Sequence, residues 1–145
     1  MIGLIQRVSS ASVEVDDKII GAIDRGILAF IGIEKHDTES QAKRMLDRIL
    51  SYRIFEDANE KMNLNIKDIQ GGLLLVSQFT LVADTKSGTR PGFSTAMHPS
   101  KSHILFEYLT TLAKQKHSAT AMGEFGAFMK ISLCNEGPAT FILRT

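Results

Sequence analysis

The segment from Ile27 to Ile33 constrains the fold more than any other part of the sequence. It reads Ile-Leu-Ala-Phe-Ile-Gly-Ile, so that apolar side chains occupy consecutive positions. Successive side chains of a strand point to opposite faces of a sheet, and a strand with this pattern must be covered on both faces. We therefore expect packed layers above and below this segment.

Other strand-like runs precede and follow this segment. Val13 and Val15 alternate with polar residues, which is the period of a half-buried strand. Asp16-Asp17-Lys18 predicts a tight turn into a partner strand over residues 19–23. Three further strands are expected over Leu73–Ala83, roughly 127–134 and roughly 139–144, the last two joined by a turn at Gly137-Pro138.

Two amphipathic helices interrupt the strands. Thr38 is a good N-cap, and Gln41 three residues later completes a capping box. The second helix begins at Pro99, because proline is favoured in the first helical turn. Helical spacing gives the first helix the apolar face Ala42, Met45, Leu46, Ile49 and Leu50, and the second the face Ile104, Leu105, Tyr108, Leu109 and Leu112.

The order of these elements predicts the fold class. Many strands with two helices indicate an α+β fold, a mainly antiparallel sheet or partial β-barrel with two covering helices. The 145 residues, 43% of them hydrophobic, are enough for one domain over residues 1–145 with its own core. Residues 56–70 are polar and rich in turn residues, so we expect little regular structure there.

The net charge and the cysteine content limit which binding partners and which cellular compartment we expect. A net charge of +1 gives no global attraction for nucleic acid, so any RNA contact must be local. Cys134 is the single cysteine, which excludes an internal disulfide and suits a reducing cytoplasm. It lies in an apolar strand pattern, and we expect it to be a small buried hydrophobe. No apolar run reaches the roughly 18 residues of a membrane-spanning helix.

The titratable residues offer no conventional catalytic set. No histidine has a metal-ligand spacing or adjoins a glycine-flanked serine or cysteine; the four are His36, His98, His103 and His117. Gly71-Gly72 lacks the downstream lysine of a phosphate-binding loop. A metalloenzyme, a triad hydrolase and a nucleotide hydrolase are therefore disfavoured, and we expect neither a metal nor a cofactor.

Two short segments are candidates for a site. Ser77–Leu81 places hydroxyls and an amide in an otherwise apolar strand. These groups either bond neighbouring backbone at a strand end, or line a pocket where backbone N–H groups and the Thr80 hydroxyl bind a developing oxyanion. Gly137-Pro138, within Asn135–Thr140, is either an ordinary turn or a cis step that exposes backbone carbonyls to a ligand. The residues alone leave both choices open.

The two segments together resemble those of the bacterial D-aminoacyl-tRNA deacylases, and the resemblance covers essentially the whole chain. Ser77–Leu81 and Gly137-Pro138 are the two motifs that define that family, and they occur here in the expected order. The other matching segments are Ile5-Gln6-Arg7-Val8, Ala11-Ser12-Val13, Tyr52-Arg53-Ile54-Phe55, Lys61-Met62-Asn63, Val76, Arg90-Pro91, Phe93 and Ala139-Thr140-Phe141. At Ala139 and Cys134 bulkier aliphatic side chains would also fit, a departure that concerns packing only.

The resemblance implies a cytoplasmic homodimer with its active sites at the subunit interface. A cis Gly137-Pro138 peptide of one subunit would enter the pocket of the other and reject L-aminoacyl groups by collision with main-chain atoms. Arg7 would support the inserted loop, and Met129 would lie close to the Gly-Pro step and the terminal adenosine. The residues implied to line the pocket and act in catalysis, with main-chain N–H groups on the ester carbonyl, are Ser77, Gln78, Phe79 and Thr80.

The activity implied is hydrolysis of the ester bond of D-aminoacyl-tRNA, which is bound through its 3' end and yields free tRNA and the amino acid. Glycyl-tRNA mischarged on tRNA-Ala is a further implied substrate, because glycine has no side chain to reject. An aminoacyl ester is already activated, so positioning, an oxyanion hole and the vicinal ribose hydroxyl suffice without a side-chain base. Two alternatives stay open: a non-catalytic RNA-binding domain, and a small-molecule hydrolase or deaminase with a similar interface pocket.

Overall fold

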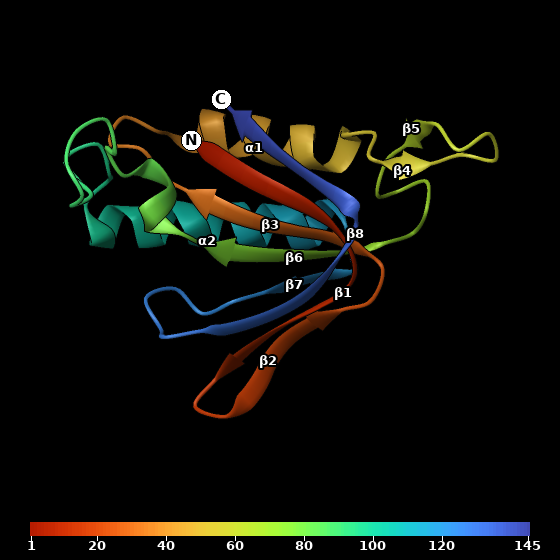
Figure 1. The fold of residues 1–145 in the computed structure, drawn as a ribbon. Helices are drawn as coiled ribbons and strands as arrows, with labels where there is room; N and C mark the ends of the chain where they lie inside the picture. Colours follow the sequence, from red (N-terminus) through yellow and green to blue (C-terminus); the bar gives the residue numbers. More distant parts are fainter.

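A computed structural model describes residues 1–145, and one curved sheet dominates it (Figure 1). The sheet order is β2-β1-β3-β6-β7, and β8 pairs with the free edge of β1. The strands are β1 (Ile2–Val15), β2 (Lys18–Ile23), β3 (Gly26–Gly32), β6 (Gly72–Ser77), β7 (Thr120–Met122) and β8 (Lys130–Arg144). The ladders of β1 with β2, β3 and β8 are antiparallel, whereas β3–β6 and β6–β7 are parallel.

The sheet curls until its two ends nearly meet, which gives the partial barrel expected from the sequence. A Cβ placed on Gly21 of β2 would lie 2.7 Å from the carbonyl oxygen of Met122 at the end of β7. This approach brings the first and last strands of the sheet order close together without a ladder between them. The α+β prediction with two covering helices is confirmed.

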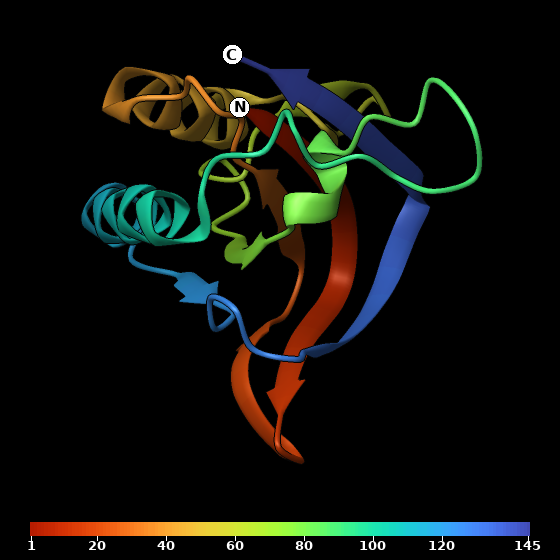
Figure 2. The same cartoon turned by 90° about the vertical axis from the view of Figure 1, so that its left-hand side faces the viewer.

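Strand β3 is covered on both faces, as its unbroken apolar pattern predicts. Ile27, Ala29 and Ile31 point into the larger core, which the helices α1 (Glu39–Ser51) and α2 (Pro99–Lys116) cover from one side (Figure 2). Leu28 points the other way, into a smaller core inside the curl of the sheet, with Val8 of β1 among its neighbours. The central strand therefore joins two separate apolar clusters.

The first helix, α1, has the N-terminal cap and the buried face that its sequence predicts. Thr38 is the N-cap, and the capping box with Gln41 is formed. The predicted face of Ala42, Met45, Leu46, Ile49 and Leu50 is buried, and neither helix of the chain is long and apolar enough to cross a membrane.

The buried face of α2 was only partly predicted. Ile104 is 68% exposed, while Phe106 and Ala113 are buried in its place beside Leu105 and Leu109. Apolar residues surround much of this helix, so packing against α1 and the sheet decides its rotation. The polar Thr110 is buried as well, because its hydroxyl donates to the Glu107 carbonyl at 3.0 Å.

Several strand predictions were wrong in extent. The strand expected over Leu73–Ala83 ends at Ser77, and a 3₁₀ helix, η1 (Phe79–Val82), follows it. The two strands expected near the C-terminus are one strand, β8, which bends at Gly137-Pro138. Residues 56–70, expected to be irregular, include part of a short hairpin of β4 (Phe55–Glu56) and β5 (Met62–Leu64), and β7 was not predicted.

Cys134 is exposed rather than buried, which corrects the prediction made from its apolar context. It pairs with Ser10 of β1, which is itself exposed. Strand β8 lies at the edge of the β1 ladder, and no further layer of the same chain covers Cys134 there.

The contact between the starts of β3 and β6 generates a stability prediction. A Cβ on Gly26 would lie 1.9 Å from the carbonyl oxygen of Gly72, which belongs to the backbone and cannot move aside. We expect Gly26→Ala to lower the free energy of unfolding by about 3 kcal/mol. Gly92→Ala is the control, since its Cβ has no contact closer than 3.7 Å, and it should change stability by less than about 1 kcal/mol. Equal urea denaturation midpoints for the two variants would contradict this account.

Candidate active site

The first candidate segment begins where β6 leaves the sheet. Ser77 is the last residue of β6 and pairs with Ile31 of β3. The Gln78 amide donates to the Ile31 carbonyl at 2.8 Å, and the chain then turns into η1. The Gln78 amide makes the last hydrogen bond to β3, and the backbone from Phe79 onward leaves the ladder as η1 begins.

The 3₁₀ turn sets the geometry of this segment, which therefore does not continue the strand expected over Leu73–Ala83. As the first residues of η1, Phe79 and Thr80 have amide groups with no carbonyl partner within that helix. The Gln78 side-chain amide donates to the Thr80 hydroxyl oxygen at 2.5 Å, which leaves the hydroxyl hydrogen free to bond elsewhere. The segment thus presents unpaired N–H donors and one hydroxyl at the surface.

Aromatic and sulfur-containing side chains border these donors. Phe79 is 63% exposed, and its ring centroid lies 5.1 Å from that of Phe93. The half-buried Met129 places its sulfur beside Gly123, next to Val76 at the end of β6. The predicted residues Ser77, Gln78, Phe79, Thr80 and Met129 therefore lie at the same end of the sheet.

The second candidate segment is a bulge in β8. Gln6 pairs with Thr140 and Val8 with Asn135, so four residues of β8 lie opposite Arg7 alone. The Gly137-Pro138 peptide within this bulge is cis, as the resemblance implied, and both residues are exposed. The bulge is held from within, because the Asn135 side-chain oxygen accepts from the Ala139 amide at 2.8 Å.

Arg7 anchors this bulge to the body of the protein. Its side chain is buried, its Nε donates to the Glu136 carbonyl at 2.8 Å, and its Nη1 donates to the Ile54 carbonyl at 2.7 Å. Glu136 also forms an ion pair with Arg25, in which Nε of Arg25 lies 3.5 Å from Oε2 of Glu136. The contacts of Ile54, Glu136 and Arg25 were missed from the sequence: two involve backbone carbonyls, which carry no side-chain signal.

The two candidate segments lie at opposite ends of the sheet in one chain. Arg7 pairs with Ile27 of β3, whereas Ser77 pairs with Ile31. Four residues of strand correspond to about 13 Å along β3. Figure 1 shows the bend of β8 on the right and the short green helix η1 on the left. Gly137-Pro138 and Arg7 are thus together, but the same chain does not bring them to Ser77–Thr80 or Met129.

The ionisable groups at the second segment already have partners: the Glu136 carboxylate pairs with Arg25, and the adjoining Arg7 donates to backbone carbonyls. The first segment contains no ionisable side chain. The clear shifts in pKa occur elsewhere on the surface. A hydrogen bond from the Asn63 side chain, with backbone amides, lowers the pKa of Asp57 in the β4–β5 turn. Hydrogen bonds to Asp17 and Glu14 raise the pKa of Lys130.

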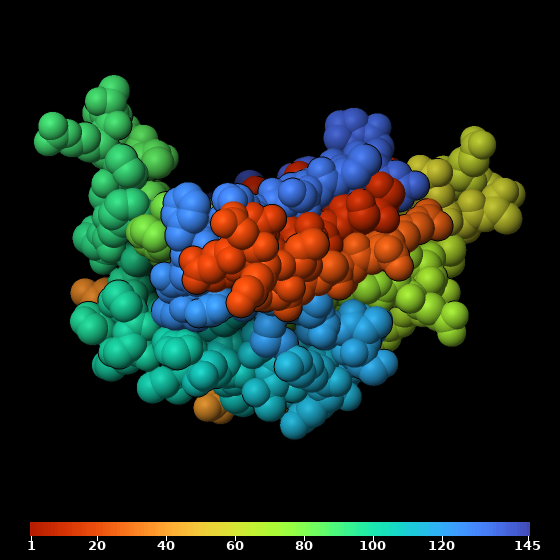
Figure 3. Space-filling model, turned by 90° about the horizontal axis from the view of Figure 1, so that it is seen from below, coloured from red at the N-terminus to blue at the C-terminus, as the bar shows by residue number.

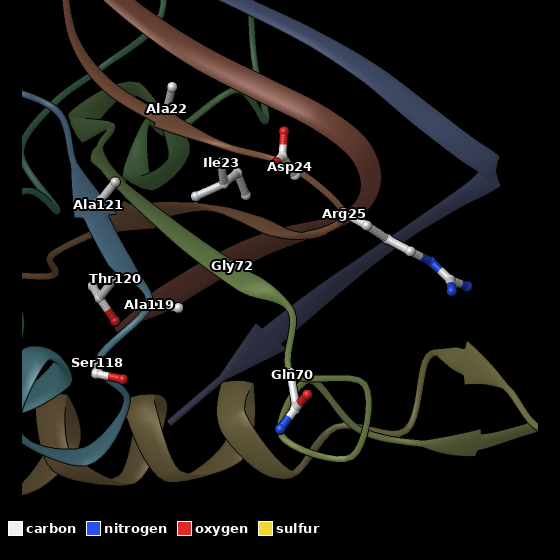
Figure 4. A pocket seen from close by; sticks show the side chains of 10 residues that line it. All are labelled: Ala22, Ile23, Asp24, Arg25, Gln70, Gly72, Ser118, Ala119, Thr120 and Ala121. Atoms are coloured by element: carbon white, nitrogen blue, oxygen red, sulfur yellow. The ribbon is translucent and has the colours of Figure 1, made fainter.

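A separate hollow of about 390 Å³ lies between β2 and the start of β7 (Figure 4). Small side chains and backbone line most of it, and the Arg25 side chain extends away from its centre. Asp24 and Arg25 are its only charged residues, and it contains no histidine or cysteine. It offers no set of groups for catalysis and is distinct from both candidate segments.

Known proteins match the chain over essentially its full length. Residues 4–144 match the family described as D-Tyr-tRNA(Tyr) deacylase, and the chain belongs to that family. The D-aminoacyl-tRNA deacylase of Pseudomonas fluorescens Pf-5 is 54% identical over 145 residues, which is the full length of both chains. That of Pseudoalteromonas translucida is 54% identical over 143 residues, or 99% of each chain.

Solved structures share the fold. The c-Myc DNA Unwinding Element Binding Protein superposes with a TM-score of 0.95 at 34% identity, over 100% of this chain and 99% of that one. A probable eukaryotic D-amino acid tRNA deacylase has a TM-score of 0.86 at 16% identity, over 99% and 98% of the two chains, a likeness of fold alone.

The double contact of Arg7 leads to a prediction. Arg7→Lys keeps the charge, but one ammonium group cannot replace two donors directed at carbonyls of different segments. We expect the free energy of unfolding to fall by about 1.5–3 kcal/mol, the range for a lost hydrogen bond to a charged group. The control is Arg44→Lys, at an exposed position on α1. It should change the free energy of unfolding by no more than about 0.5 kcal/mol. A wild-type urea midpoint for Arg7→Lys would show that the anchor is dispensable.

Proposed function

We propose that this member of the family hydrolyses the ester bond of D-aminoacyl-tRNA in the cytoplasm and releases free tRNA and the amino acid. Relatives of full length at 50–54% identity bear the name D-aminoacyl-tRNA deacylase. The observation that carries the proposal is the pair of exposed residues Phe79 and Thr80, which offer backbone N–H donors and a hydroxyl but no acid, base or nucleophile of high reactivity. Such a site suits an ester that is already activated.

The active site is shared between two copies of the chain. Gly137-Pro138 of one copy enters the pocket formed by Ser77–Thr80 of the other, because the two segments lie too far apart in one chain to act together. Large apolar side chains on the surface support this assembly: Phe79 is 63% exposed and Phe128 is 86% exposed in the single chain. The outer edge of β8 is free of a strand partner in the single chain, so it is available to the second copy.

Catalysis rests on positioning and on charge stabilisation. Water attacks the ester carbonyl carbon, and negative charge develops on the carbonyl oxygen as the tetrahedral intermediate forms. The amides of Phe79 and Thr80 bind this oxygen, and the Ser77 and Gln78 side chains shape the pocket around it. The ester C–O bond then breaks, and the leaving ribose oxygen takes a proton that the vicinal ribose hydroxyl relays from the attacking water.

Chiral selectivity comes from main-chain atoms. The Gly137-Pro138 carbonyls occupy the space that the side chain of an L-aminoacyl group would need, whatever the chemistry of that side chain. D-residues of varied size and glycine are accepted, and glycine carried on tRNA-Ala is therefore a substrate. Met129 contacts the terminal adenosine at the same end of the sheet as Ser77–Thr80.

The oxyanion role of the backbone is tested with proline. Phe79→Pro removes one amide hydrogen at a first helical position, where proline itself is tolerated. We expect kcat for a D-aminoacyl-tRNA to fall about a hundredfold or more relative to the matched control Phe79→Ala, which loses the same ring but keeps the amide. Thr80→Ala should cost less than about tenfold, the scale of one neutral hydrogen bond. Equal rates for the proline and alanine variants would remove the oxyanion role.

The screening role of the Gly-Pro step is tested at Gly137. A Cβ there would lie 2.8 Å from Nη2 of Arg7, and the residue has φ of +134°. We expect Gly137→Ala to displace the carbonyls, slow D-aminoacyl-tRNA hydrolysis and lower the ratio of D to L rates in single-turnover assays. Gly88→Ala is the control for the D/L ratio, because the residue has a positive φ but open space around its Cβ and lies outside both candidate segments. An unchanged D/L ratio in Gly137→Ala would contradict main-chain screening.

A further inference from the structure

The longest stretch of the chain without a carboxylate follows η1 and runs from residue 85 to residue 106. Between Asp84 and Glu107 there is no aspartate or glutamate, while Lys86, Arg90 and Lys101 are present together with two histidines. We refer to residues 85–106 as the basic segment. Its three cations are exposed, and none of them forms an ion pair within the chain. The basic segment thus carries three cations and no carboxylate of its own, in a protein of net charge +1.

The basic segment lies directly beside the candidate active site. It follows η1 in the chain, and its first part is a loop that Figure 3 shows in green, projecting from the rest of the molecule. Two backbone hydrogen bonds between Asp84 and Gly92, of 2.7 and 3.0 Å, close the base of this loop. The Phe93 ring on Phe79 and a hydrogen bond from the Thr95 hydroxyl to the Val82 carbonyl fasten it to η1.

Neighbouring carboxylates do not neutralise these cations. Glu34 forms an isolated β-bridge with Ala96, which brings Glu34 and Asp37 close to the segment. Both carboxylates bind the Met1 amino group, at 2.8 Å for Glu34 and 2.6 Å for Asp37. The Asp84 carboxylate accepts a hydrogen bond from the Lys86 backbone amide at 3.0 Å. The Glu107 carboxylate lies with its Oε1 3.4 Å from Nε2 of His103. The side chains of Lys86 and Arg90 are thus available to an external anion.

We propose that the basic segment binds the phosphodiester backbone of the acceptor arm of the RNA substrate, an inference that rests on the proposed function. Lys86 and Arg90 contact phosphates that precede the terminal adenosine, while the aminoacyl ester lies against Phe79 and Thr80. Lysine and arginine contacts to phosphate fix the position of a nucleic acid without reading its bases. A short cluster of this kind is the local RNA contact that a nearly neutral protein needs.

Binding of RNA is measured with a fluorescent hairpin that ends in a single-stranded 3' CCA. In the double variant Lys86→Gln/Arg90→Gln we expect Kd at about 0.1 M salt to rise about tenfold, and the salt dependence of log Kd to lose a slope of about 1.5, the value for two phosphate contacts. The control Lys43→Gln/Arg44→Gln removes the same charges from an exposed stretch of α1 and should leave Kd within about twofold. An unchanged Kd in the first variant, or an equal loss in the control, would overturn the proposal.

Kinetics separate this surface from the catalytic site. With D-aminoacyl-tRNA the Lys86/Arg90 variant should show a raised KM and an unchanged kcat. With D-aminoacyl-adenosine, which lacks the phosphates, its kcat/KM should equal that of the wild type. An equal loss with both substrates would place the two residues in the catalytic pocket and contradict the proposal. A wild type that hydrolyses neither substrate would refute the proposed function instead, while the hairpin measurement would still test the basic segment.

Discussion

The buried guanidinium of Arg7 is the interaction on which the placement of the Gly-Pro step depends. It joins β1 to the carbonyls of Ile54 and Glu136, residues that are 47 and 129 positions away in the sequence. Burying a charge is unfavourable unless its hydrogen bonds are satisfied, and the two carbonyls satisfy Arg7 only if β8 bulges at residues 136–139. The Glu56 carboxylate lies 3.6 Å from Nη1 of Arg7 and pairs with its charge. The hydrogen bond from Nε to the Glu136 carbonyl holds the bulge from which Gly137-Pro138 emerges, and the side chain of Asn135 completes the bulge from within.

The proposal of a shared site rests on where the two motifs stand along β3. Arg7 lies beside Ile27 and Ser77 beside Ile31, so the central strand itself keeps the Gly-Pro step and the released amides of η1 apart in one chain. Under the proposed function each motif would be incomplete alone: the first would lack a screen for chirality, and the second would lack oxyanion donors. Two copies related by symmetry would supply two complete sites, because each copy contributes both halves. The basic segment lies beside Ser77–Thr80 and would bind the RNA backbone there.

Features set by local sequence could be predicted, and features set by distant contacts could not. The capping box at Thr38 and Gln41 depends on neighbouring residues alone, and the unbroken apolar run of β3 is enough to predict that both of its faces are covered. The end of β6 at Ser77 depends on its ladder with β3, and the rotation of α2 depends on its packing, so neither was visible in the sequence. For the site, the two motifs carried the resemblance, whereas the partners of Arg7 are backbone carbonyls with no identity of their own. Cys134 was misjudged because the apolar run around it has no layer to cover it in one chain.

The central claim is that each active site combines Ser77–Thr80 of one chain with Gly137-Pro138 of another, and mixed dimers test it most directly. Phe79→Pro damages the first half and Gly137→Ala the second, so that a dimer with one chain of each kind has one site damaged in both halves and one site intact. Co-expression of the two variants under separate affinity tags should restore about a quarter of the wild-type rate on a D-aminoacyl-tRNA if chains pair at random in two-fold dimers. A site contained within one chain would be damaged in every copy, so a rate for the mixture no higher than the mean of the two separate variants would contradict the account.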